Sequence, residues 1–87
     1  MSSKTTLLKV FYSFSDVMTE ARDRTKTSGV CHHAEPYSTN PSALAWVLVN
    51  ETGNYLYSDG EMKQPTEAVA QDLAVRRDKR KRLSVDY

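Results

Sequence analysis

Residues 43–58, with the sequence ALAWVLVNETGNYLYS, carry the strongest structural signal in the chain. The first eight are rich in Val, Leu and Trp, which fit strands, and the apolar pattern resumes at Tyr55–Ser58. Between them, Glu51–Asn54 contains Gly53, which suits a tight reversal. This stretch therefore predicts a β-hairpin.

The two faces of this hairpin differ in composition. A four-residue loop places Asn50 opposite Tyr55. One face then holds Trp46, Leu48, Tyr55 and Tyr57, and the other holds Ala45, Val47, Val49 and Leu56. We expect helices to cover the Ala and Val face, because small and branched side chains allow close packing, and the aromatic face to point outward. A shift of one residue would exchange the faces, and the alternatives are that the rings form core or a self-association patch.

Two elements are predicted before the hairpin. Residues 4–12 alternate in polarity as a strand does, with Lys9 on the outward side. Ser13 with Asp16 has the spacing of a helix N-cap, and Gly29 suits a helix end, so a helix is expected between them.

The remaining segments give a long loop and a second helix. Residues 28–42 contain two prolines among small polar residues, and residues 30–34 form an optional short edge strand. Pro65 precedes a helix expected from about Thr66 to Arg82. The predicted fold class is α+β: a small antiparallel sheet of three or four strands with two helices on one face. The order is strand, helix, optional strand, two hairpin strands, helix.

Composition limits the size and class of the protein. Eighty-seven residues are expected to form a single domain, residues 1–87. Leu, Val and Phe together number 17 and Ile is absent, so the core is thin and a partner or a second copy is a plausible source of stability. The apolar run at residues 43–49 is too short to span a membrane. The single Cys31 and the lack of an export signal predict a cytoplasmic protein.

Charge is concentrated near the carboxyl end. Residues 76–82 hold six cations interrupted only by Asp78, whereas the whole chain has a net charge of +1. The cations are Arg76, Arg77, Lys79, Arg80, Lys81 and Arg82. Because the apolar stripe of this helix continues into Arg76 and Arg80, we expect its end, about residues 76–87, to project from the body. The pattern predicts binding to a polyanion.

Several readings of the basic segment remain open. A nucleic-acid site would combine these cations with Lys9 and the outward rings of Trp46, Tyr55 and Tyr57, and rings favour RNA over duplex DNA. The segment is otherwise a solvated helix end with Asp72 and Arg76 paired at i,i+4. It also resembles a nuclear-import address, with Ser84 in a setting that a kinase accepts.

Cys31, His32, His33 and Glu35 form the one cluster with catalytic or metal-ligand chemistry. A zinc site is not expected, because ligand pairs normally come from two segments and this chain has no other Cys or His. A Cys nucleophile is disfavoured because the histidine next in sequence points elsewhere. General acid–base cleavage of RNA by either histidine is a further alternative.

The sequence thus predicts a non-enzymatic regulatory protein that binds RNA, without cofactor or metal. The main alternative is an inhibitor that binds a nuclease, toxin or polymerase through its open sheet, with or without bridging RNA. A homodimer is compatible with both.

Overall fold

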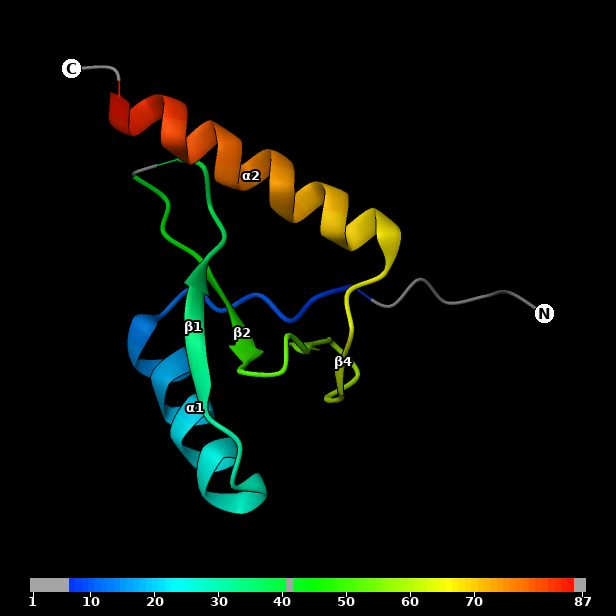
Figure 1. The fold of residues 1–87 in the computed structure, drawn as a ribbon. Helices are drawn as coiled ribbons and strands as arrows, with labels where there is room; N and C mark the ends of the chain where they lie inside the picture. Colours follow the sequence, from blue (N-terminus) through cyan, green and yellow to red (C-terminus); the bar gives the residue numbers. More distant parts are fainter. Residues whose placement is uncertain (1–6, 41, 86–87) are drawn as a thin grey trace.

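The computed structural model describes residues 7–40 and 42–85, and the side chains of residues 82–85 lie outside what it describes. Along the chain it has α1 (Phe14–Ser28), β1 (His32–Pro36), β2 (Trp46–Asn50), β3 (Tyr55–Leu56), β4 (Met62–Lys63) and α2 (Glu67–Val85) (Figure 1). The four strands form one antiparallel sheet in the order β1-β2-β3-β4. The predicted α+β class with two helices is confirmed, as is the optional strand, which occupies 32–36.

Helix α1 begins and ends at the residues that local chemistry favours. The Ser13 hydroxyl accepts a hydrogen bond from the Asp16 amide at 3.3 Å. At the other end, Gly29 has a φ of 76° and donates its amide to the Thr25 carbonyl, a left-handed C-cap. On the inner face, Val17 and Ala21 are buried.

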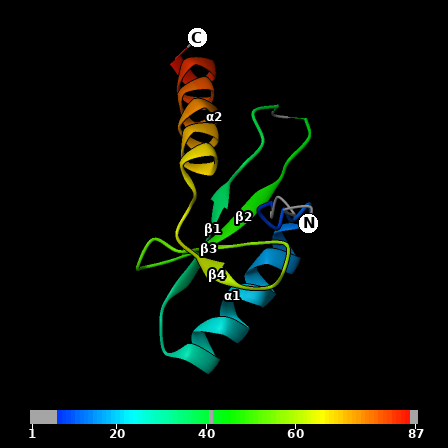
Figure 2. The same cartoon turned by 90° about the vertical axis from the view of Figure 1, so that its right-hand side faces the viewer.

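The two helices pack on opposite faces of the sheet. Val17 and Ala21 of α1 join Leu48 and Leu56 in one cluster, with Trp46 packed against it. Leu73 of α2 belongs to the other cluster, whose remaining buried residues are Leu8, Val47, Val49, Tyr55 and Tyr57. Figures 1 and 2 show the strands between the two helices. The predicted placement of both helices on one face is therefore wrong, because each face of β2 carries enough apolar side chains to need a cover.

The register of the hairpin differs from the prediction by one residue. Val49, not Asn50, lies opposite Tyr55. The reason is Asn50, whose Oδ1 accepts hydrogen bonds from the Thr52 amide, the Thr52 hydroxyl and the Asn54 amide at 3.1, 2.7 and 2.9 Å. The Asn50 side chain thus organises the turn while its backbone pairs with His32 of β1, and Tyr55 moves to the face of Val47 and Val49.

The amino-terminal segment inserts between strands that have separated. Phe11 exchanges two backbone hydrogen bonds with Trp46 at the start of β2, both 2.8 Å. Lys9 donates its amide to the Leu56 carbonyl, and Ser58 donates to the Leu7 carbonyl. The strand predicted over residues 4–12 appears as two isolated bridges, and residues 4–6 lie outside the described part.

Helix α2 is attached to the sheet by few apolar residues. Leu73 is 3% exposed and Val69 is partly buried, whereas Val75 on another side is 53% exposed. Within the described residues, neither helix combines the length and apolar composition that crossing a membrane requires.

Candidate nucleic-acid interface on helix α2

Two groups of side chains attach the middle of α2 to the body, and we call them clasps. The Glu35 clasp consists of Glu35 on β1, Tyr55 on β3 and Arg77 on α2. Arg77 Nη2 donates to Glu35 Oε1 and Oε2 at 3.0 and 2.9 Å and to the Tyr55 hydroxyl at 2.8 Å. The Tyr55 hydroxyl in turn donates to Glu35 Oε1 at 2.9 Å.

The electrostatics of the Glu35 clasp follow from these contacts. Its hydrogen bond to Glu35 raises the pKa of Arg77, which stays charged. Burial, followed by the hydrogen bond to Glu35, raises the pKa of Tyr55. The clasp is therefore a charged pair with a neutral phenol between its ends.

The Asp72 clasp repeats this chemistry on the neighbouring arginine. Arg76 Nε donates to Asp72 Oδ2 at 2.9 Å, and the Tyr37 hydroxyl donates to the same oxygen at 3.1 Å. The guanidinium carbon lies 3.9 Å from the centroid of the Tyr37 ring, a cation–π contact. Arg76 Nη1 also donates to the Tyr37 carbonyl at 3.3 Å.

These contacts correct the predicted point at which the helix leaves the body. Arg76 was expected to project, since a buried unpaired cation is costly. Asp72 and Tyr37 instead neutralise and cover it, and Glu35 does the same for Arg77. Contact with the body therefore continues at least to Arg77.

Beyond the clasps lie the remaining cations of α2. Lys79 is exposed and Arg80 half-buried, and neither forms an ion pair with a residue that the structure describes. Nη1 of Arg80 is buried and has no hydrogen-bond partner there. Lys81 is exposed, and the side chain of Arg82 lies outside the described part. Lys79 and Arg80 are thus the described cations of α2 that no ion pair with another described residue neutralises.

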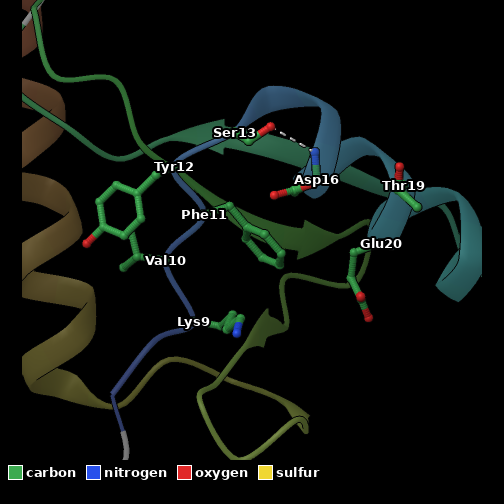
Figure 3. Close-up of a pocket in the computed structure, with 8 residues that line it drawn as sticks. All are labelled: Lys9, Val10, Phe11, Tyr12, Ser13, Asp16, Thr19 and Glu20. Atoms are coloured by element: carbon green, nitrogen blue, oxygen red, sulfur yellow. Dashed lines mark hydrogen bonds between the residues drawn. The ribbon is translucent and has the colours of Figure 1, made fainter.

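Lys9 lies elsewhere. Its ammonium is 5.8 Å from the centroid of the Phe11 ring and borders an open hollow with Asp16 and Glu20 of α1. Figure 3 shows Tyr12 and Val10 pointing toward α2, whereas Phe11 lies on the α1 side. The structure therefore does not bring Lys9 to the cations of α2.

The predicted aromatic platform is wrong. Tyr55 and Tyr57 are 6% and 2% exposed and pack beneath α2, a consequence of the one-residue register shift. Trp46 is half-buried on the opposite face, 5.4 Å from the Phe14 ring in an edge-to-face contact. The three rings share no open surface on which bases stack.

The Cys and His segment is divided by the alternation of β1. His32 Nδ1 lies 2.6 Å from the Val30 carbonyl, whereas His33 and Cys31 are exposed. Within residues 7–40 and 42–81, no three His, Cys, Asp or Glu side chains are placed to hold a metal ion.

Sequence reasoning found the cations and missed their partners in the sheet. The pairing of Asp72 with Arg76 could be predicted from their i,i+4 spacing. Glu35 and Tyr37 lie about forty positions before the arginines they bind, and Glu35 appeared only as a candidate metal ligand. No local signal links such residues.

No family model matches this chain, and comparison with curated proteins and with solved structures finds none similar to it. Its function must therefore be argued from its own residues.

Proposed function

We propose that this chain is a non-enzymatic regulatory protein that binds RNA by holding the phosphate backbone against the end of α2. The observation that carries the proposal is the contrast along that helix. Asp72 of the same helix and Glu35 of β1 already neutralise Arg76 and Arg77, whereas Lys79 and Arg80 have no ion pair with a described residue. Lys81 and Arg82 follow directly in sequence.

The proposed mechanism is electrostatic capture. Lys and Arg that neutralise phosphates release condensed counterions, so affinity falls with salt by nearly one logarithmic unit per contact. Arginine-rich segments are a recurring RNA-binding element, which supports RNA over duplex DNA. Because the rings are buried, the proposal no longer includes base stacking on Trp46, Tyr55 or Tyr57.

The test compares the effect on RNA affinity of removing cations from α2 with the effect of removing cations from another helix. Lys79→Gln combined with Arg80→Gln is titrated into labelled single-stranded RNA at two salt concentrations. We expect affinity to fall and the salt slope to decrease by about 1.4, since each contact to a single strand contributes about 0.7. The matched control is Arg22→Gln with Lys26→Gln, which removes the same charge from exposed positions of α1.

Equal losses in the two double variants would reject α2 as the site, because they would reflect net charge alone. A parallel titration with duplex DNA of the same length tests the preference for RNA. No chemical step is proposed for His32 or His33. We place this activity in the cytoplasm, on the expectation that the single exposed Cys31 needs a reducing compartment.

A protein-binding inhibitor remains a second candidate, on a different surface from the one predicted. Both faces of the sheet carry a helix, so the sheet is not the docking face. Tyr12 and Phe14 at the start of α1, 79% and 52% exposed, favour contact with a partner. A complex that survives nuclease digestion and is lost with Tyr12→Ser would support this candidate.

A further inference from the structure

We infer that the two clasps restrain RNA binding: Glu35 and Asp72 occupy Arg77 and Arg76 as internal competitors for phosphate, and a bound strand displaces them. This inference rests on the proposed function and adds its regulation. In the closed state the strand meets only the cations beyond the clasps. In the open state it gains two more arginines.

The chemistry of the clasps matches that of a phosphate site. Arg77 donates to two carboxylate oxygens and to a phenol oxygen, and the two non-bridging oxygens of a phosphodiester can replace the carboxylate pair. All of its hydrogen bonds to described side chains come from Nη2. Nε and Nη1 therefore remain available as donors to an incoming oxygen.

Both arginines are partly exposed; Glu35 is less exposed than Arg77, whereas Asp72, at 46%, is more exposed than Arg76. The Arg77 side chain is 49% exposed and that of Glu35 is 17% exposed. Arg76 is 31% exposed in its clasp. A phosphate therefore reaches both guanidinium groups from solvent without disturbing the sheet beneath.

The energetic balance permits exchange. A partly exposed ion pair contributes little to stability, because water screens it. A strand held at Arg80 lies roughly 4.5 Å along the helix axis from Arg77, since the rise is about 1.5 Å per residue. The next phosphates thus compete at high effective concentration. Leu73 and Val69 keep the first half of α2 packed against the sheet while the clasps open.

The consequence is a reduced apparent affinity. When the binding-competent state is a fraction of the population, apparent affinity falls by that fraction. Removing the internal competitor should therefore strengthen binding, although the variants lose a structural contact.

The test uses the full chain and the isosteric substitutions Glu35→Gln and Asp72→Asn. The probe is labelled single-stranded RNA at two salt concentrations, with folding checked by far-ultraviolet circular dichroism. The control is Glu51→Gln, which removes one negative charge from an exposed turn position. We expect each clasp variant to bind several-fold more tightly than the control and to gain about one unit of salt slope.

The outcomes separate the two proposals. If Glu35→Gln and Asp72→Asn change affinity and slope no more than Glu51→Gln while the wild-type chain binds, the restraint is wrong and the RNA site stands. If no chain binds at low salt, both are wrong.

A second measurement covers the case in which a clasp variant fails to fold. The guanidinium ¹⁵N signals of Arg76 and Arg77 are followed in the wild-type chain as the RNA is added. Signals that move together with binding support displacement of the carboxylates. Signals that stay fixed at saturating RNA overturn it.

Discussion

Asn50 determines which side chains each face of the sheet presents. Its side chain occupies the turn and leaves Val49 to pair with Tyr55. Because neighbouring strand residues point to opposite faces, this one choice buries both hairpin tyrosines beneath α2. The exposed surface of the molecule therefore depends on a residue that is itself 8% exposed.

Asn50→Ala should lower the free energy of unfolding by about 1–3 kcal/mol, because partly buried turn amides lose their acceptor. Chemical denaturation measures the change. Asn40→Ala is the matched control, since Asn40 accepts similar hydrogen bonds from Ser42 at an exposed position where water substitutes. A loss as large for Asn40→Ala would contradict the role given to burial.

The phenols of the clasps predict a dependence on alkaline pH. Burial is the main cause that raises the pKa of both Tyr55 and Tyr37 above the ordinary value of about 10. The folded state thus favours the neutral phenol. This stabilisation is fully present below about pH 10 and is lost as pH rises through the higher folded pKa.

Urea denaturation near pH 8 and near pH 11 checks this expectation, and tyrosinate absorbance reports the titration. The free energy of unfolding should fall between the two conditions, and Tyr55→Phe should lose less than the wild-type chain. An identical loss in Tyr55→Phe would show that Tyr55 contributes nothing to the alkaline instability.

Among the elements, α2 has the weakest apolar attachment. Leu73 is its one buried apolar residue in the described part, and the clasps supply the remaining fixed contacts. Most of the stability of a protein helix comes from packing of one face, so this helix depends on a single side chain more than α1 does.

Leu73→Ala should therefore cost about 2–5 kcal/mol of folding free energy. Val75→Ala is the control on the same helix, and at 53% exposure it should change stability by less than about 0.5 kcal/mol. Thermal or urea unfolding of both variants decides the matter. Similar losses would mean that α2 is not held by the Leu73 contact.

Local signals explain why both helices and the hairpin were predictable, whereas β4 and the arrangement of the elements were not. Ser13 and Gly29 specify both ends of α1 through contacts within four residues. The hairpin turn was also recognisable, but its register depends on one hydrogen-bonding choice by Asn50. The clasp partners of Arg76 and Arg77 depend on tertiary contacts, which is why a basic run was predicted to project when part of it is bound.

At the scale of the whole molecule, the amino-terminal segment joins distant parts of the chain. Leu8 is 8% exposed and belongs to the cluster beneath α2, and it forms an isolated bridge with Tyr57. The adjacent Leu7 is 64% exposed. The segment therefore contributes a buried side chain to a hydrophobic core that is small because the chain is short.

Leu8→Ala should destabilise the chain by about 2–5 kcal/mol, whereas Leu7→Ala should be nearly neutral. The pair differs only in the direction of neighbouring side chains, so equal midpoints in a denaturation experiment would reject the described pairing of this segment.

That pairing also has a consequence during synthesis. Residues 7–11 leave the ribosome before their hydrogen-bond partners at Trp46, Leu56 and Ser58, which lie about 35 to 51 positions later in the sequence. Contacts of such long sequence separation form late and slowly. Leu8 and Phe11 therefore stay without these partners until the chain has been made at least as far as Trp46, and chaperone capture of this segment is most needed in that interval.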